Sequence, residues 1–244
     1  MAKLTKAQLE QYRRDGYTLH HDQLFSSSEL GKLTEIFEDQ LAQKGSKLSD
    51  ELDTPHFREP RLFEFLLADK VLDLVEPITG PDITLWSSHF ICKDPFVGRA
   101  TPWHEDSAFW KGRVNTYEGI VTVWLAIDRS TKVNGCMRAI PGTHINGFST
   151  YHEVGTDMNT FHLAMDTVDE ERAVYFELER GECSMHDSRI IHGAEPNTSA
   201  YRRCGYTMRY LPAATRVIPE MNIGHKVWLA RGRPQAGNVY ENVA

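Results

Sequence analysis

Two histidines and one aspartate have the residue types and the spacing of a metal-binding set. His104 and Asp106 are separated by one residue, and His192 lies far downstream. On an extended strand, residues i and i+2 point to the same side, so we expect the His104 imidazole and the Asp106 carboxylate to reach one metal ion. With His192 they would form the facial set of two histidines and one carboxylate that binds non-haem Fe(II) and leaves three coordination positions open.

The other histidines of the chain are weaker candidates. His20 and Asp22 repeat the His-x-Asp spacing, but they lie in a part of the chain that is expected to be mainly helical. Six more are interpreted as hydrogen-bonded core residues or surface groups: His89, His144, His152, His162, His186 and His225. The sequence therefore predicts the metal site at His104, Asp106 and His192.

Strand periodicity distinguishes two adjacent arginines that follow the distal histidine. If residues 202–210 form a strand, its faces carry Arg203, Gly205, Thr207 and Arg209 on one side, and Arg202, Cys204, Tyr206, Met208 and Tyr210 on the other. The first face is small and polar, which suits a metal cavity. A 2-oxo acid that chelates iron carries a second carboxylate, and we expect the Arg203 guanidinium to bind it through two parallel hydrogen bonds. Arg209 is expected to line the pocket or to pair with an acid.

Four segments of the chain resemble the phytanoyl-CoA dioxygenase family. They are residues 102–110, 123–127, 134–144 and 192–203, and the wider resemblance runs from about Thr5 to Arg233. It implies an Fe(II)- and 2-oxoglutarate-dependent oxygenase, with O2 as a second cosubstrate, on a double-stranded β-helix of the jelly-roll, cupin-like type. It says little about the substrate, because members act on acyl thioesters, amino acids and natural-product scaffolds.

The resemblance also implies roles for individual residues. Arg203 stands eleven residues after the distal histidine, where the family places its carboxylate clamp, and Trp124 would wall the 2-oxoglutarate site. Thr122 shares the strand face of Trp124, and Lys93 lies where relatives often carry a lysine near the cosubstrate. Ala194 is a departure, since many relatives have a serine there whose hydroxyl contacts 2-oxoglutarate.

The residues directly after the metal pair are candidates for substrate contacts. Phe109, Trp110 and Arg113, together with Arg209, would give a partly aromatic pocket with a cationic rim. The alternative, that Phe109 and Trp110 are simply core residues, is equally open.

The carboxylate at position 106 determines which reactions are expected. Asp106 leaves no coordination position for chloride, which the related halogenases gain from a glycine or alanine, so hydroxylation is the expected outcome. Desaturation, ring closure and epoxidation stay open. A cupin-like barrel can also bind a metal as an isomerase, a hydrolase or a non-catalytic binding module. Arg203 argues against these alternatives, because a site that only binds metal does not need it.

Length and composition fit a single domain of the barrel class. The 244 residues are 41% hydrophobic, which is enough for one sizeable core over residues 1–244. A net charge of −7 and a pI of about 5.9 argue against nucleic acid or an anionic membrane as a partner. The four cysteines form no C-x-x-C pair, and no segment has the length of a signal core or a membrane span. We expect a soluble, cytoplasmic protein.

Helices are expected first and strands afterwards. Residues 1–80 are predicted as a helical support region, with capping boxes at Thr5 and Ser26 that start helices ending near Gly16 and Gly45. A short strand is expected over residues 17–24, a mobile loop over 47–56, and two short helices over 60–67 and 70–75.

The β-helix core is expected over residues 81–215. Its predicted strands are residues 83–92, 119–127, 136–140, 173–178, 182–186 and 203–211. Residues 153–172 are polar and show no strand alternation, which indicates a lid over the substrate or, equally, a solvated insertion.

Overall fold

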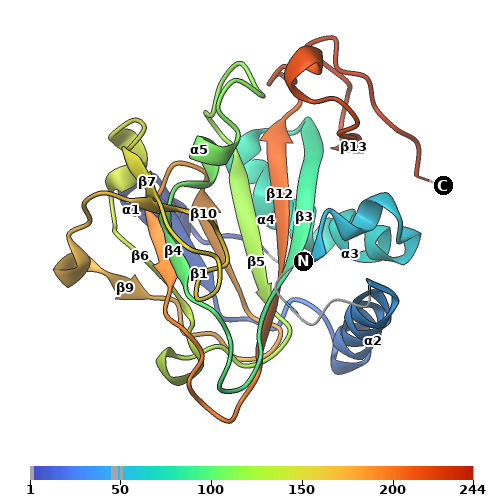
Figure 1. Cartoon of the computed structure of the whole chain (residues 1–244). Helices are drawn as coiled ribbons and strands as arrows, with labels where there is room; N and C mark the ends of the chain where they lie inside the picture. Colours follow the sequence, from blue (N-terminus) through green and yellow to red (C-terminus); the bar gives the residue numbers. More distant parts are fainter. Residues whose placement is uncertain (1–2, 45–48, 50–51, 244) are drawn as a thin grey trace.

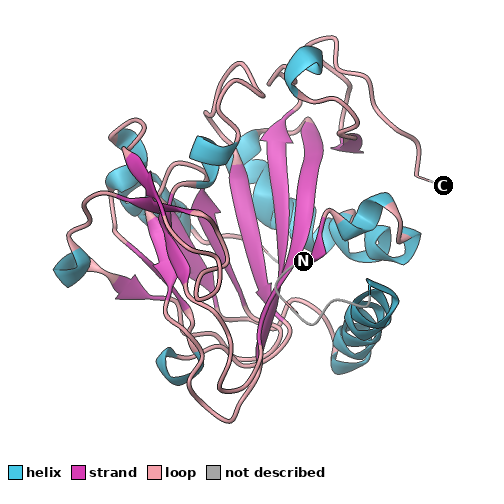
Figure 2. Cartoon of the chain, viewed as in Figure 1, coloured by secondary structure: helices cyan, strands magenta, loops and turns pink. Residues whose placement is uncertain are grey.

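Antiparallel β-sheets form the centre of the protein (Figures 1 and 2). The computed structural model describes residues 3–44, 49 and 52–243. The larger sheet has the order β1 (Tyr17–His20), β10 (Cys183–Asp187), β5 (Val121–Ala126), β12 (Arg203–Pro212), β3 (Ile83–Lys93) and β13 (Trp228–Arg231), with β2 (Leu52–Asp53) beside β3. The smaller sheet has the order β4 (Thr101–His104), β11 (His192–Ala194), β6 (Met137–Ala139) and β9 (Val174–Tyr175). A separate hairpin consists of β7 (Tyr151–Glu153) and β8 (Leu163–Met165).

Helices pack mainly against one face of the larger sheet. The α-helices are α1 (Lys6–Asp15), α2 (Ser27–Lys44), α3 (Phe63–Leu66), α4 (Asp69–Thr79) and α5 (Asp106–Phe109). The 3-10 helices are η1 (Pro55–Phe57), η2 (Pro60–Leu62), η3 (Lys132–Asn134), η4 (Thr143–Ile145), η5 (Glu170–Arg172) and η6 (Pro219–Met221). Within the described ranges, no helix combines the length and the apolar character that crossing a membrane requires.

The two faces of the larger sheet pack against different partners. Alternate residues of β5 and β12, such as Val123 and Tyr206, lie in one apolar core with α2, α3 and α4. The opposite face, which includes Trp124, packs against β6 residues of the smaller sheet such as Met137. Each fully buried large apolar side chain contributes roughly 1.5–3 kcal/mol, so both faces stabilise the fold. The space between the sheets is where polar side chains can be collected.

The predicted helix boundaries agree with the structure at both long N-terminal helices. The Thr5 side chain accepts from the Gln8 amide, the Gln8 side chain accepts from the Thr5 amide, and Gly16 ends α1 in the left-handed conformation. Ser26 and Glu29 form the same reciprocal pair at the start of α2. The predicted end at Gly45 lies outside the described residues.

The predicted strands are confirmed in place, with shifted ends. The strand expected over 17–24 stops at His20, and that expected over 173–178 shrinks to β9. The loop expected over 47–56 lies partly outside the described residues, and its described part is wrong as a loop, because it contains β2 and η1. The helix expected over 70–75 is longer, since α4 continues through Pro77 to Thr79.

The segment 153–172 contains strand residues, so the expectation of a segment without strands is wrong. Its first residue ends β7, and the segment contains the whole of β8, which pairs with β7 in a hairpin. The connection from 154 to 162 is tied to the residue before β4, because the Ala100 amide donates to Met158 (2.9 Å) and the Thr160 amide donates to Ala100 (2.8 Å). Strands of three residues are too short to show an alternation in the sequence.

Candidate functional site

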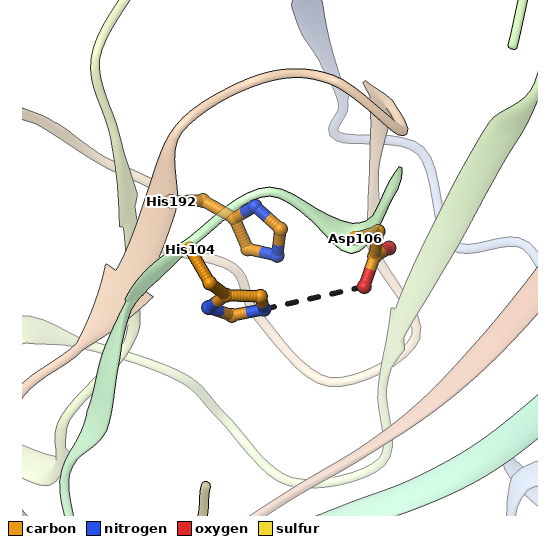
Figure 3. Close-up of side chains that lie close together, drawn as sticks. All are labelled: His104, Asp106 and His192. Carbon is orange, nitrogen blue, oxygen red and sulfur yellow. Dashed lines mark ion pairs between the residues drawn. The ribbon is translucent and has the colours of Figure 1, made fainter. Parts of the chain in front are cut away.

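The three predicted metal ligands converge between the sheets (Figure 3). His104 ends β4, and His192 begins β11 directly opposite it in the antiparallel register. Asp106 follows two residues after His104, and one possible ligand atom from each residue lies within 4.8 Å of the other two. All three side chains are buried. The structure thus brings together the set that the sequence singled out.

Asp106 does not lie on a strand, and that part of the prediction is wrong. β4 ends at His104, and Asp106 is the first residue of the four-residue helix α5. The convergence survives because Glu105 keeps an extended backbone, with φ −108° and ψ 134°. Residues i and i+2 across an extended residue still point to the same side. The chain therefore turns away from the sheet only after both side chains have been placed.

Backbone carbonyl groups orient the two histidines. His104 Nδ1 lies 2.8 Å from the Pro102 carbonyl oxygen, and His192 Nδ1 lies 3.0 Å from that of Ile190. Because a carbonyl oxygen only accepts, Nδ1 carries the proton in each ring and Nε2 keeps its lone pair. Burial lowers the pKa of both imidazoles, most strongly at His192, and this favours the neutral form. A neutral imidazole with a free Nε2 is the form that binds a metal.

Hydrogen bonds leave the Asp106 carboxylate one free position. Thr122 Oγ1 donates to Oδ2 (2.9 Å), while Arg209 Nε donates to Oδ2 and Nη2 to Oδ1, both at 3.3 Å. A carboxylate offers about four lone-pair sites, so about one remains, on Oδ1. Oδ1 is also the oxygen that lies 4.0 Å from His104 Nε2 (Figure 3).

The charge of Asp106 is maintained inside the protein. Burial alone would raise the pKa of its carboxyl, but Arg209 and the adjacent His186 outweigh this effect and hold the pKa well below its usual range. Two neutral imidazoles and one ionised carboxylate with a single free lone pair are a donor set that fits Fe(II). The residues present therefore fit the metal that the sequence predicts.

Arg203 lies in the same cavity as the predicted ligands and has no acidic partner among the described residues. The cavity lining includes Arg203, Trp124, Thr207 and the three ligands. The guanidinium donates to the Gly135 carbonyl from Nε (3.0 Å) and Nη2 (2.7 Å), and more weakly to Ile91 (3.4 Å). Within the described residues, no carboxylate lies within 4.0 Å of it.

Arg202 has the opposite environment, as the strand alternation predicted. Its Nε lies 2.7 Å from Asp128 Oδ2, and its Nη1 pairs with Glu38. Arg202 is therefore a neutralised arginine near the surface, while Arg203 is only 2% exposed and keeps its charge unpaired. A buried, unneutralised guanidinium is costly, which indicates a place for an anion.

Gly205 makes room for the aromatic wall of this cavity. The Trp124 indole lies beside Arg203, with 5.3 Å from the guanidinium carbon to the ring centroid. A Cβ at position 205 would stand 2.1 Å from Trp124 Cζ2, so any side chain there would displace the indole. Glycine between Arg203 and Thr207 thus allows the Trp124 indole to lie beside Arg203, and its contact with a cosubstrate stays a prediction.

Two predicted cosubstrate residues have partners in the protein itself. The Thr122 hydroxyl donates to Asp106, so this residue orients a predicted ligand while it also lines the cavity. Lys93 is fully buried, and its Nζ donates to the carbonyl oxygens of Arg99, Ala194 (3.4 Å) and Glu195 (2.7 Å). It ties β3 to the segment after β11, and its contact with a cosubstrate stays a prediction.

A second cavity, of about 400 Å³, shares Asp106, Phe161 and Arg209 with the first. The four predicted substrate residues all line it: Phe109, Trp110, Arg113 and Arg209. Trp110 is also a core residue, because it is buried and packs edge-on against Trp86 with 6.1 Å between ring centroids. Both interpretations of this tryptophan are therefore compatible with its position. Arg209 pairs with Asp106, which was one of its two expected roles.

The sequence analysis missed His186 and Phe161. His186, on β10, lines the ligand cavity, its Nε2 lies 3.7 Å from Asp106 Oδ2, and neither ring nitrogen finds a hydrogen-bond partner within the described part of the chain. Its alternation with the core residue Met185 is a signal that could have placed it toward the cavity. Phe161, between β7 and β8, lies 4.9 Å from the His104 ring and 5.2 Å from Phe109.

Glu105, between the two ligands of the predicted pair, anchors the hairpin. Its side chain is buried and accepts hydrogen bonds from Ser149 Oγ (2.6 Å) and from the Tyr151 hydroxyl. The Glu105 amide also donates to the Tyr151 oxygen (3.1 Å). Burial, followed by the hydrogen bond to Glu105, raises the pKa of Tyr151, which keeps its hydroxyl protonated as a donor.

Comparison with known proteins gives the family. The family model described as phytanoyl-CoA dioxygenase (PhyH) matches residues 12–205, which is well over half of the chain. The chain belongs to the phytanoyl-CoA dioxygenase family. The matched range contains all three predicted ligands and Arg203.

Two curated relatives show how far the likeness extends. A phytanoyl-CoA dioxygenase domain-containing protein 1 homolog from Dictyostelium discoideum is 29% identical over 184 residues, which cover 73% of this chain and 63% of the relative. The peroxisomal phytanoyl-CoA dioxygenase of Homo sapiens is 29% identical over 156 residues, covering 60% of this chain and 45% of that protein. The chain thus spans less than two thirds of the length of these members of the phytanoyl-CoA dioxygenase family.

Solved structures show the same fold. The non-heme monooxygenase ThoJ, in its apo form, has a TM-score of 0.80 at 21% identity and covers 96% of this chain and 87% of that one. EvdO2 from Micromonospora carbonacea var. aurantiaca, complexed with 2-oxoglutarate, has a TM-score of 0.67 at 24% identity, with 89% and 94% coverage. At these identities the likeness establishes the fold alone.

Proposed function

We propose that the protein is an Fe(II)- and 2-oxoglutarate-dependent oxygenase that acts on a small molecule. The observation that carries the proposal is the buried Arg203 guanidinium, without an acidic partner among the described residues, in the same cavity as His104, Asp106 and His192. A metal site alone would not require a buried arginine, whereas a cosubstrate with a second carboxylate would. Membership of the phytanoyl-CoA dioxygenase family supports the same conclusion.

In this proposal each residue of the cavity has a separate task. His104, His192 and Asp106 Oδ1 hold the iron, and Arg203 binds the distal carboxylate of 2-oxoglutarate beside the Trp124 indole. When bound, iron and 2-oxoglutarate together activate O2 and oxidise the substrate, with succinate and CO2 as further products. Because Asp106 keeps a carboxylate at the metal, we propose hydroxylation as the reaction, with desaturation or ring closure as variants.

Arg209 and Thr122 act through the metal ligand. Both donate to Asp106, so they fix which carboxylate oxygen faces the histidines. The apolar part of the lining, such as Trp124 and Phe161, would limit the access of water to the metal site, which protects a reactive centre from side reactions. The larger cavity beside Asp106, with Phe109 and Trp110 in its lining, would receive the substrate.

The proposal extends to the architecture. We propose that the two facing sheets form the double-stranded β-helix of this enzyme class and that residues 1–244 are one domain. Residues 1–80 would support the β-helix of 81–215, and residues 153–172 would cover the substrate. The contact of Phe161 with His104 supports a covering role for the hairpin connection.

An anaerobic titration tests the function directly. Fe(II) and 2-oxoglutarate together should give a weak visible absorption band through chelation, and neither should give it alone. The band should be absent in His104→Ala and retained in the matched variant His21→Ala. His21 directly follows β1, and its side chain is 60% exposed and does not line the ligand cavity. Protein that binds Fe(II) but shows no band with 2-oxoglutarate would contradict the proposal.

A further inference from the structure

The cavity beside Asp106 has two chemically different ends. At the metal end its lining includes Asp106, Phe109 and Phe161. The ring centroids of the two phenylalanines lie 5.2 Å apart, so the rings touch. At the other end stand Arg113 and Trp86, together with His225. A molecule in this cavity would therefore meet aromatic rings near the iron ligands and a guanidinium group farther away.

Arg113 is held in place by hydrogen bonds with a buried asparagine, Asn222. Arg113 Nε donates to Asn222 Oδ1 (2.7 Å), while Asn222 Nδ2 donates back to the Arg113 carbonyl (2.7 Å) and to the Ile218 carbonyl (2.8 Å). The guanidinium also lies over the Trp86 ring, 4.9 Å from its centroid. A long, flexible side chain is thus fixed before any ligand arrives, which reduces the entropy lost on binding.

The fixed guanidinium is neither neutralised nor saturated with hydrogen bonds. Within the described residues, its terminal nitrogens make no hydrogen bond and no carboxylate lies within 4.0 Å. Asp53 also lines the cavity and its charge acts on Arg113, but its side chain is 68% exposed to solvent and lies more than 4.0 Å from the guanidinium. Burial, and then the charge of Arg113, lower the pKa of His225 to about 4, so His225 is neutral at pH 7 and Arg113 is the fixed cation at this end.

We propose that the substrate carries a carboxylate that Arg113 binds, and that its apolar or aromatic body packs against the touching rings of Phe109 and Phe161 on its way toward the iron. This rests on the proposed function and adds the chemical class of the substrate. Arg113 would then determine specificity, because a planar guanidinium pairs with a carboxylate through two parallel, charge-assisted hydrogen bonds. It binds a neutral amide or ester more weakly, because these groups carry no charge. The oxidised carbon would lie at the end of the molecule opposite its carboxylate.

Matched acids and amides test this recognition. Phenylacetate, 3-phenylpropionate and 4-phenylbutyrate, and the corresponding three amides, are titrated calorimetrically into the anaerobic Fe(II)–2-oxoglutarate protein. Saturating 2-oxoglutarate occupies Arg203, so a probe carboxylate cannot be bound there. We expect at least one acid to bind tenfold or more tightly than its amide. No preference for any acid in the wild type would overturn the inference.

Three variants assign the preference to Arg113. In Arg113→Gln the acid should lose at least tenfold in affinity while the amide changes less than twofold, and Arg113→Lys should recover part of the loss. Lys111→Gln removes a charge two residues away on an exposed side chain and should keep the full preference. An equal loss in Lys111→Gln, or an unchanged preference in Arg113→Gln, would overturn the assignment.

Two further measurements separate the possible causes of failure. Thermal unfolding of each variant shows whether it is folded. The visible band of the iron chelate, which does not involve Arg113, is recorded on the same samples. A missing band in the wild type contradicts the proposed function itself, whereas an intact band without an acid preference contradicts only the role of Arg113.

Discussion

Removing the Arg203 guanidinium should weaken the binding of 2-oxoglutarate far more than removing the neighbouring Arg202. Arg203 is buried and unpaired, so its full charge is available to a carboxylate, whereas Arg202 is already paired with Asp128 and Glu38. Loss of a bidentate charge-assisted pair in such a site costs about 2–4 kcal/mol. This corresponds to a roughly 30- to 1,000-fold rise in the Kd for 2-oxoglutarate.

The structure also predicts a separate effect on stability that must be controlled. Arg203→Ala leaves the Gly135 and Ile91 carbonyl oxygens without this donor, which costs about 1–3 kcal/mol in the free energy of unfolding, and it also removes a buried unpaired charge, which offsets part of that cost. Arg203→Lys keeps a donor and a charge but loses the planar fork, so it should fold better and still bind 2-oxoglutarate weakly.

The assay measures the Kd from the iron chelate band and the KM for 2-oxoglutarate from succinate formation. In Arg202→Ala both values should stay within about threefold of the wild type, because the main loss there is of ion pairs that are partly exposed to solvent. A larger effect in Arg202→Ala than in Arg203→Ala would refute the assignment of the clamp and the strand face on which it rests.

Four more results are expected. His104→Ala, Asp106→Ala and His192→Ala should abolish turnover, while His20→Ala should keep the Fe(II) affinity within a few-fold; full activity in His104→Ala would contradict the ligand set. Arg209→Gln leaves the Asp106 carboxylate buried without its cationic partner, at a cost of about 3–5 kcal/mol in the metal-free protein. Since a metal ion would replace the lost positive charge, Mn(II) should raise the Tm of this variant more than that of the wild type, and an equal rise would contradict this. Burial lowers the pKa of His56 to about 3, so the unfolded state binds a proton at His56 at a higher pH than the folded state does. The free energy of unfolding should therefore be highest above about pH 6.5 and decrease toward pH 4. In His56→Gln this dependence on pH should be weaker. Limited proteolysis of residues 154–162 in the Fe(II)–2-oxoglutarate complex should slow only when substrate is added, and equal cleavage with a verified substrate would show a static insertion.

Alternation along the longer strands predicted much of the cavity from sequence. Along β12 and β5 the side chains face alternately the helices and the space between the sheets. This alternation predicted that Arg203, Arg209 and Trp124 face the cavity and that Arg202 does not. The pattern is readable because these strands have six or more residues and one face is packed against an apolar core.

Elements that depend on tertiary contacts could not be predicted in the same way. The hairpin strands β7 and β8 have three residues each and hold no pattern of their own. The role of His186 depends on its contact with Asp106, which is 80 positions away along the chain. The pairing of β10 with β5 brings the two residues together, and the sequence alone does not show this pairing. The sequence predicted Lys93 near the cosubstrate, but it could not predict the carbonyl oxygens that Lys93 contacts. Three of them, from Arg99, Ala194 and Glu195, come together only in the folded chain.

The attachment of the hairpin at Glu105 divides that segment into a stem and an exchangeable tip. Ser149 and Tyr151 fasten the stem to the residue between the predicted ligands, whereas the connection over 154–162 reaches the cavity through Phe161. Grafting the connection from a relative should therefore alter which substrates are accepted while the iron site is preserved. Replacing the stem as well would disturb both at once, so Ser149 and Tyr151 set the natural boundary for loop engineering in this enzyme.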